Sequence, residues 1–279
     1  MRVFSVDLYE HFALPLPEGA AGTLTCYIQD TPAGQGKLRP AMLVLPGGGY
    51  CHVSPREGEP IAQAYLAKGY HAFVLEYSVF PARFPVALRE AAMAMAYIRG
   101  NTEAFAIRKV AAVGFSAGGH LCGSLGMLFD CPEVADIAPA HVLRPDVLGL
   151  CYPVTVSYQP THGGSFDSLC GDDAALRSRL SLDSLVRPDM PPVYLWHTRE
   201  DDCVPCVGTL ILAQRLVEQG IDCALHLYHR GWHGLATADA QTNDAHGLVN
   251  ISADVSGWID EFALFLEEKG FAITSHPAE

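Results

Sequence analysis

The sequence predicts an α/β fold in which a mostly parallel central sheet is covered by helices on both faces. Short apolar runs of strand length alternate along the chain with longer helix-like segments, and this alternation is typical of parallel sheets. Several of the short runs are apolar at nearly every position, as expected of strands that are buried on both faces. The helix-like segments begin near proline and end at glycine, which is the usual punctuation of helices.

The predicted strands leave room for a helix between most neighbours. They cover residues near 3–9 and then 23–29, 41–45, 70–76, 109–113, 146–151, 192–197 and 223–228. The predicted helices cover 59–68, 86–99, 117–128, 206–219 and 254–268. Pro85 opens the second of these helices, and Gly220 and Gly270 follow the last two. The segments 30–40 and 158–173 are rich in glycine and proline, so we expect them to be surface loops.

The composition predicts a single domain, 1–279, without a separate cap. Of the 279 residues, 49% are hydrophobic and 18% charged, which is enough apolar material for one sizeable core. The net charge of −13 disfavours nucleic acid and anionic membranes as partners. No stretch approaches the roughly 20 apolar residues of a membrane span, and residues 1–30 show no secretion signal. Together with nine scattered cysteines, this favours a cytoplasmic protein with reduced thiols.

Residues 114–118 carry the pattern G-x-S-x-G where a predicted strand meets a predicted helix. In α/β-hydrolases this pattern forms a strained turn that projects the serine hydroxyl from the end of the sheet. A glycine-rich turn with a capping serine is the alternative, but the position between strand and helix favours a nucleophile. We therefore predict that Ser116 is catalytic. His120, which follows the motif, is equally compatible with lining the site and with packing the helix.

A serine nucleophile needs a base to accept its proton and an acid to orient the base, and in this fold the acid precedes the histidine. The predicted strand 192–197 runs into an acidic loop, in which Asp201 and Asp202 are both candidates for the acid. The strand 223–228 is followed by His233, which lies between glycines and is the candidate base. Most of the 12 histidines must have ordinary roles, so this prediction depends on the motifs occurring together.

Three consecutive glycines, 47–49, follow Pro46 directly after the predicted strand 41–45. Glycines in this place bring backbone N–H groups close to the oxyanion that develops during acyl transfer. The N–H of Ala117, which follows the nucleophile, is a further donor of this kind. A plain flexible loop would have the same composition, and we prefer the oxyanion hole because the other motifs accompany it.

No metal and no cofactor are predicted. The C-x-x-C pair at 203–206 is separated from His229 and His233 by residues 207–228, a longer gap than the about 12–15 residues of a zinc-finger pattern. A metal would also occupy the histidine that Ser116 requires. The sequence contains neither a dinucleotide-binding G-x-G-x-x-G motif nor a Walker-type loop.

From about residue 40 to the end, the chain resembles the bacterial acetylesterase and acetyl-xylan-esterase-like branch of the α/β-hydrolases. The resemblance depends on PGGGY at 46–50, REGEP at 56–60, YSV at 77–79, PARFP at 81–85, GFSAGGH at 114–120, LCYPV at 150–154, PVYLWHT at 192–198 and GWHG at 231–234. The chain departs from the wider esterase class at Pro46, where many relatives have histidine before the three glycines. This departure leaves open which hydrogen bonds hold the loop.

By this resemblance, Ser116 is the nucleophile and His233 the base. The acid is Asp201, because the family pattern places the carboxylate four residues before a proline, here Pro205. The oxyanion hole is formed by Gly48, Gly49 and Ala117. The implied activity is hydrolysis of small-molecule acetyl or other short-chain esters, notably of carbohydrates, through an acyl-enzyme. An amide or peptide hydrolase of the same fold, such as an arylformamidase or a prolyl-oligopeptidase-like enzyme, is the alternative, and a catalytically dead binding protein is a third possibility.

The expected preference for short acyl groups follows from the absence of an obvious cap. The chain before Pro46 already has to supply three strands, which leaves no room for two cap helices there. The segment 158–185 is rich in glycine, serine and charge, so it would make a poor apolar lid. A long acyl chain would therefore gain little buried apolar area.

Overall fold

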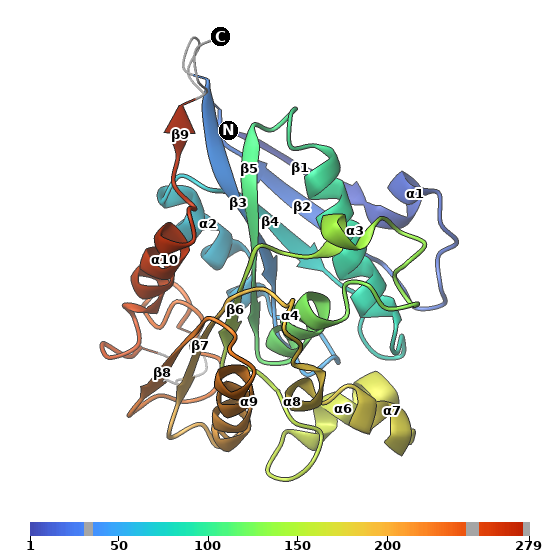
Figure 1. The fold of residues 1–279 in the computed structure, drawn as a ribbon, viewed down its shortest axis with the longest axis vertical. Coiled ribbons are helices and arrows are strands. Elements are labelled where there is room, and N and C mark those ends of the chain that lie inside the picture. Colours follow the sequence, from blue (N-terminus) through green and yellow to red (C-terminus); the bar gives the residue numbers. More distant parts are fainter. Residues whose placement is uncertain (31–35, 244–250, 276–279) are drawn as a thin grey trace.

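The computed structural model describes residues 1–30, 36–243 and 251–275, and a twisted sheet runs through the middle of the molecule (Figure 1). From edge to edge its strands are β1 (Arg2–Asp7), β2 (Thr23–Ile28), β4 (His71–Glu76), β3 (Lys37–Leu45), β5 (Ile107–Phe115), β6 (Val147–Cys151), β7 (Val193–Thr198) and β8 (Cys223–Tyr228). All pairings from β4 to β8 are parallel, whereas β1, β2 and β4 pair antiparallel. The prediction of a mostly parallel sheet is confirmed.

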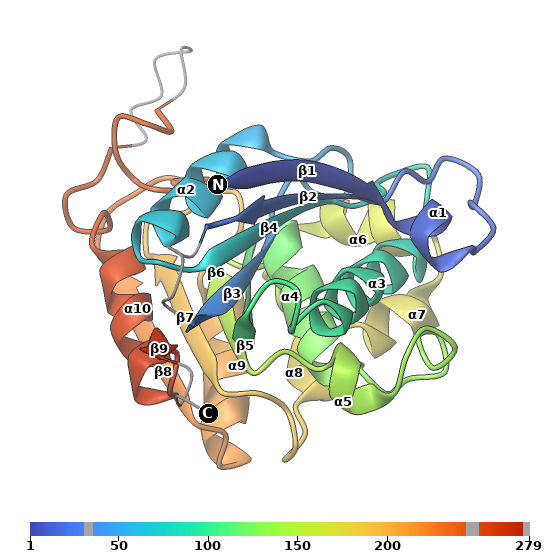
Figure 2. The same cartoon turned by 90° about the horizontal axis from the view of Figure 1, so that it is seen from above.

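Helices cover both faces of this sheet (Figure 2). One core joins a face of the sheet to α3 (Val86–Gly100), α4 (Ala117–Met127) and α9 (Val207–Glu218). A second core joins the opposite face to α2 (Glu59–Ala67) and α10 (Trp258–Glu268). Within β3, Leu43 and Leu45 belong to the first core, and Met42 and Val44 to the second. Because successive side chains of a strand point to opposite faces, an entirely apolar strand fills both cores.

The largest differences between predicted and observed boundaries lie at α10 and β3. Helix α10 begins at Trp258 rather than at residue 254. The segment 30–40 was expected to be a loop, but β3 already begins at Lys37, and residues 31–35 lie outside the described residues. Strand β3 extends this far because β9 (Thr274–Ser275) pairs with its first residues in antiparallel orientation.

The segment 158–173 is wrongly predicted as a loop, because it contains α6 (Gly163–Cys170) and is followed by α7 (Ala174–Arg179) and α8 (Leu182–Leu185). His162 caps α6 by accepting a hydrogen bond from the backbone N–H of Ser165. The side chains of Phe166 and Leu169 are buried in the first core. Few apolar residues anchor α6, so its glycine-rich composition concealed the helix.

Three further short helices, not predicted from the sequence, are α1 (Leu8–Phe12), η1 (Pro55–Glu57) and α5 (Ala140–Leu143). Among the described residues, no helix is both long and apolar enough to cross a bilayer.

The parallel strands bring several loops to one edge of the sheet. Strands β3, β5, β7 and β8 end at Leu45, Phe115, Thr198 and Tyr228. Because β9 pairs with the start of β3, the carboxyl ends lie at the opposite end of the molecule, where α6 and α7 are also found (Figure 1). Ligands of open α/β sheets bind outside these carboxyl ends, and all the candidate catalytic residues follow them in the sequence.

Candidate active site

Ser116 lies in a sharp turn between β5 and α4, with φ 53° and ψ −119°. A residue other than glycine is strained at a positive φ, and such strain persists only where the surroundings impose it. Here the backbone N–H of Ser116 donates to the carbonyl oxygen of Cys151 at 3.0 Å, and its carbonyl oxygen accepts from the N–H of Val154 at 3.0 Å. The turn therefore has the strand-to-helix context that G-x-S-x-G predicted.

The glycines of this motif are required by two close approaches, of β5 to α4 at Gly114 and of α4 to the end of β3 at Gly118. A Cβ atom on Gly114 would lie 2.1 Å from the carbonyl oxygen of Gly118. A Cβ atom on Gly118 would lie 2.2 Å from the carbonyl oxygens of Leu45 and Pro46. Real Cβ contacts essentially never fall below 3.0 Å, so larger residues would push the serine turn away from the loop that follows β3.

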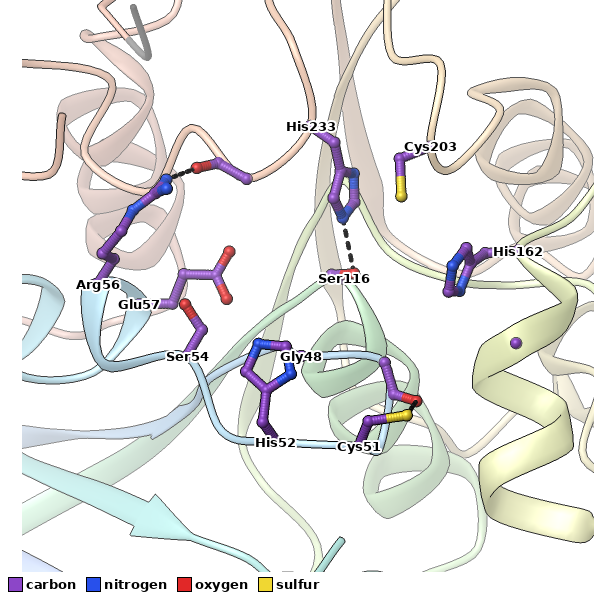
Figure 3. Close-up of a pocket in the computed structure, with 13 residues that line it drawn as sticks. Gly48, Cys51, His52, Ser54, Arg56, Glu57, Ser116, His162, Cys203 and His233 are labelled. Carbon is purple, nitrogen blue, oxygen red and sulfur yellow. Dashed lines mark hydrogen bonds between the residues drawn. The ribbon is translucent and has the colours of Figure 1, made fainter. Parts of the chain in front are cut away.

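Ser116, His233 and Asp201 form a hydrogen-bonded chain. The Oγ atom of Ser116 lies 2.8 Å from Nε2 of His233 (Figure 3), and Nδ1 of the same ring lies 2.7 Å from Oδ2 of Asp201. Because an ionised carboxylate only accepts hydrogen bonds, Nδ1 carries the proton, and Nε2 accepts from the serine hydroxyl. An imidazole in this tautomer is able to take up the serine proton at Nε2.

Asp201 is fixed by further donors. Its Oδ1 atom accepts hydrogen bonds from the backbone N–H groups of Cys203 at 3.0 Å and Val204 at 2.8 Å. Its Oδ2 atom also lies 3.2 Å from Nε2 of His197. Burial by itself raises the pKa of Asp201, but the hydrogen bonds from His197 and His233 outweigh it and hold the pKa below its ordinary value. Asp201 is therefore ionised at neutral pH.

Only one of the two adjacent acids reaches the histidine. Asp202 is exposed and accepts no hydrogen bond from the residues that the structure describes.

His197, the fully buried neighbour of Asp201, was not assigned a role from the sequence. Its Nε2 atom lies 2.9 Å from the carbonyl oxygen of Val204 as well as near Asp201. Because both of these oxygens only accept, Nε2 carries the proton, and Nδ1 accepts from the hydroxyl of Thr209 at 2.8 Å. The available signal was its place at the end of a buried strand, four residues before Asp201.

The glycines after β3 form a tight turn, with φ +124° at Gly48 and +64° at Gly49. The N–H of Gly47 is already engaged, because it donates to Oε2 of Glu57 at 2.7 Å. In the described part of the chain, the N–H groups of Gly48, Gly49 and Ala117 donate no hydrogen bond. Gly48 and Gly49 line the same cavity as Ser116.

Side chains from other elements hold this turn at Pro46, the position where the sequence departs from the wider esterase class. The carbonyl oxygen of Pro46 accepts a hydrogen bond from the hydroxyl of Tyr77 at 2.7 Å. Glu57, which is only 4% exposed, accepts from the hydroxyl of Tyr152 at 2.6 Å in addition to the N–H of Gly47. Glu57 and Tyr152 lie in segments that carried the family resemblance, but no sequence pattern linked one to the other.

These groups open into a cavity of about 380 Å³ (Figure 3). Polar and titratable side chains line it, namely Cys51, His52, Ser54, Arg56, Glu57, Ser116, His162, Cys203 and His233. Because His162 is the cap residue of α6, the segment 158–185 forms part of the wall. Burial lowers the pKa of His162, and the nearby His233 lowers it further, so this ring is neutral at pH 7.

His120 does not line this cavity. Its side chain is buried, with Nδ1 2.9 Å from the hydroxyl of Tyr50 and Nε2 2.8 Å from the carbonyl oxygen of Leu180. Burial lowers its pKa to about 4. Of the two roles left open by the sequence, the structure supports helix packing.

Within the described ranges, no group of three or more His, Cys, Asp or Glu side chains is arranged to hold a metal ion. The two thiols of the C-x-x-C pair are both free. Cys203 lines the cavity, whereas Cys206 precedes α9 as its cap residue. Burial, aided by the charges of Asp201 and Asp202, raises the pKa of the Cys203 thiol, so it is protonated at neutral pH.

Comparison with known proteins shows which family and which relatives the chain is similar to. The BD-FAE family matches residues 28–137. The chain is 38% identical over 215 residues to endo-1,4-beta-xylanase B of Butyrivibrio fibrisolvens, a match that covers 72% of this chain and 33% of that protein. It is 26% identical over 233 residues to the acetylxylan esterase of Xylanibacter ruminicola, with coverage of 80% and 45%. The chain thus spans less than half the length of either relative.

A solved structure matches over nearly the whole chain. The acetyl ester-xyloside bifunctional hydrolase from Caldicellulosiruptor lactoaceticus has a TM-score of 0.82 and 32% identity, and the match covers 97% of each chain. The fold is that of an α/β-hydrolase, as the sequence predicted. The chain belongs to the esterase branch of this superfamily, a branch of carboxylic ester hydrolases that includes acetylxylan esterases.

Proposed function

We propose that the protein hydrolyses carboxylic esters, with Ser116 as nucleophile, His233 as general base and Asp201 as the acid that orients it. The observation that carries this proposal is the hydrogen-bonded chain from Asp201 through His233 to Ser116, with distances of 2.7 and 2.8 Å. These distances are within the reach required for proton transfer between a nucleophile and its base. Ser116 also lines the cavity that would hold the substrate.

In the acylation step, the Oγ atom of Ser116 attacks the ester carbonyl carbon while Nε2 of His233 accepts the hydroxyl proton. The imidazolium that forms is stabilised by the ionised carboxylate of Asp201. The negative charge that develops on the carbonyl oxygen is stabilised by the N–H groups of Gly48, Gly49 and Ala117. As the tetrahedral intermediate collapses, the imidazolium protonates the departing alcohol.

In the deacylation step, the same imidazole removes a proton from a water molecule, which attacks the acyl carbon. The same N–H groups stabilise the second oxyanion, and the proton then returns to Oγ of Ser116 as the carboxylic acid is released. No step needs a cofactor or a metal, because acid, base and nucleophile are all side chains.

We infer that the substrates are acetyl esters, including acetylated carbohydrates. Hydrogen-bonding side chains of His52, Ser54 and His162 line part of the cavity, and they would pair with the hydroxyl groups of a sugar. Behind the oxyanion turn, the side chains of Tyr50, His120 and Phe166 pack without space for even a water molecule. A long acyl chain therefore has no apolar channel there. The acetylxylan esterase among the relatives supports the same inference.

Amide or peptide hydrolysis is the alternative, because the same groups can cleave either bond. The similarity to an acetylxylan esterase and to an acetyl ester-xyloside hydrolase supports ester hydrolysis, and we propose no second function.

A substrate panel tests this proposal. We expect kcat/KM for p-nitrophenyl esters to be highest for acetyl and to fall by about tenfold or more toward decanoyl, because the packed side chains of Tyr50, His120 and Phe166 leave no room for added methylenes. Acetylated xylo-oligosaccharides should release acetate. Turnover of formyl anilides or aminoacyl-prolyl amides above that of acetyl esters would support the amide alternative. An optimum at octanoyl or longer would contradict the inferred preference for short acyl groups.

A further inference from the structure

Arg56 and Glu57, which are adjacent in η1, each contact one of two proposed catalytic loops. These are the loop after β8 that carries His233, called the base loop, and the glycine turn after β3, called the oxyanion turn. The guanidinium of Arg56 donates a hydrogen bond to the carbonyl oxygen of Gly234, which directly follows His233 (Figure 3). The carboxylate of Glu57 accepts the N–H of Gly47 at 2.7 Å, directly before the proposed oxyanion donors. One short helix therefore contacts both the base loop and the oxyanion turn.

Tyr152 extends the contact of Glu57 to the base loop. Its hydroxyl donates to Oε1 of Glu57 at 2.6 Å and accepts from the backbone N–H of Ala236 at 3.0 Å. Its ring packs edge-on against the imidazole of His233, with centroids 5.1 Å apart and an interplanar angle of 73°. Two hydrogen bonds in series thus link the Gly47 amide to the tyrosine that packs against the base.

The contacts that join Gly47, Glu57 and Tyr152 are buried, and they leave no room for a side chain at position 47. Glu57 is 4% exposed and Tyr152 is 1% exposed, so the bonds between them compete little with water. Burial, together with the charge of Glu57, raises the pKa of Tyr152 well above its ordinary value, and its hydroxyl therefore stays a donor. A Cβ atom on Gly47 would lie 2.7 Å from Oε2 of Glu57. Only glycine allows the carboxylate to approach the turn this closely.

We propose that Glu57 is a positioning residue that holds the oxyanion turn and the base loop in register, with Tyr152 as its link to the base. This inference rests on the proposed function. The N–H groups of Gly48 and Gly49 and the imidazole of His233 have to converge on one carbonyl group. A misplacement of about 1 Å in such an arrangement can lower the rate by about a hundredfold, and the loss falls on kcat rather than on substrate binding.

Three variants of the full chain separate positioning from simple stabilisation. Glu57→Ala should lower kcat for p-nitrophenyl acetate by about a hundredfold, with KM within about twofold of the wild-type value. Glu57→Gln should recover only part of this loss, because its amide oxygen accepts from Gly47 while its NH₂ group faces Tyr152, whose hydroxyl proton then has no acceptor. Tyr152→Phe keeps the ring and removes only the hydroxyl, so we expect a loss of about tenfold in kcat.

The chain offers a matched control in a second buried tyrosine–glutamate pair. The hydroxyl of Tyr9 donates to Oε1 of Glu90 at 2.9 Å, and both side chains are buried. Neither residue lines the active-site cavity. Tyr9→Phe removes the same kind of hydrogen bond as Tyr152→Phe, and it should leave kcat unchanged even if it lowers the unfolding temperature.

The double variant Glu57→Ala/Tyr152→Phe tests whether the two residues act as one unit. We expect it to be no slower than Glu57→Ala alone, because the link is already broken. Independent, multiplicative losses would overturn the link through Tyr152. The inference would be overturned as a whole if Tyr152→Phe lost no more kcat than Tyr9→Phe, or if the losses appeared in KM. If Glu57→Ala does not fold, Tyr152→Phe decides the outcome alone.

Ser116→Ala, assayed beside these variants, keeps the two proposals apart. Retention of turnover by Ser116→Ala would contradict the proposed function itself. An inactive Ser116→Ala together with wild-type kcat in Tyr152→Phe would contradict only the positioning role of Glu57.

Discussion

Of the adjacent acids Asp201 and Asp202, only Asp201 is bonded to the imidazole of His233. Nδ1 donates to Asp201, while Asp202 is exposed. In Asp201→Asn, the new amide would donate toward Nδ1 and favour the wrong tautomer of the imidazole. We expect kcat on p-nitrophenyl acetate to fall by about 10³ to 10⁴, whereas Asp202→Asn should stay within about twofold of wild type. If Asp202→Asn were the slower variant, the acid would be misassigned.

His120 gives stability a pH dependence. Burial lowers its pKa from 6.5 to about 4, so the unfolded chain binds a proton between these pH values that the folded chain does not. The contribution of neutral His120 to the free energy of unfolding is thus complete above about pH 6.5 and is lost as the pH falls toward about 4. Its upper limit is about 3 kcal/mol. We expect the free energy of unfolding, measured in urea, to fall less steeply between pH 7 and about pH 4.5 in His120→Gln.

The exposed His141 supplies the control for this measurement. His141→Gln should leave the pH dependence of the unfolding free energy as it is in the wild type. A slope that is equally steep in His120→Gln and in the wild type would contradict the assignment of this acid sensitivity to His120. His71, whose pKa burial also lowers to about 4, would then be the next residue to replace.

The residues that sequence reasoning found differ from those it missed in how they are linked along the chain. Ser116 and the turn glycines stand in local patterns, and the order of acid and base along the chain is characteristic of the fold. Glu57 and Tyr152 are 95 positions apart, and their contact exists only because β3 and β6 end at the same edge of the sheet. No local pattern specifies such a pair.

At the scale of elements, the approach of α4 to the end of β3 is the contact that sets the site. In Gly118→Ala, the new Cβ would meet the carbonyl oxygens of Leu45 and Pro46 at 2.2 Å. We expect the unfolding free energy to fall by about 2 kcal/mol or more, and kcat to fall at least about tenfold as the oxyanion turn shifts. Denaturant unfolding and steady-state kinetics measure the two effects.

A second glycine provides the control for this substitution. Gly100, the last residue of α3, has no atom within 4 Å of a built Cβ, so Gly100→Ala should be neutral or slightly stabilising. A Gly118→Ala protein that matched Gly100→Ala in both measurements would show that the turn does not depend on this close approach.

The strands and main helices were predictable because fully apolar runs and proline or glycine boundaries mark them. Helix α6 was not, because two glycines open it and its stability comes from a side-chain cap and the burial of Phe166 and Leu169. The position of β4 between β2 and β3 was equally inaccessible, since periodicity reports which residues are buried and not which strands are neighbours.

Over the whole molecule, one sheet places the proposed nucleophile, acid, base and oxyanion turn on loops that follow four of its strands. The sequence predicted this convergence, since the carboxyl ends of parallel strands share an edge. It did not predict that α6 supplies part of the cavity wall through His162. The breadth of the match to a solved hydrolase, 97% of each chain, agrees with a site that depends on the entire sheet.

The central claim is that Ser116 carries the acyl group. Intact-protein and peptide mass spectrometry after reaction with a fluorophosphonate tests it most directly, with loss of p-nitrophenyl acetate turnover followed in parallel. We predict one adduct per chain, located on Ser116, that forms at the rate at which activity is lost, and no adduct in Ser116→Ala. Labelling of another residue, or full esterase activity in Ser116→Ala, would contradict the claim.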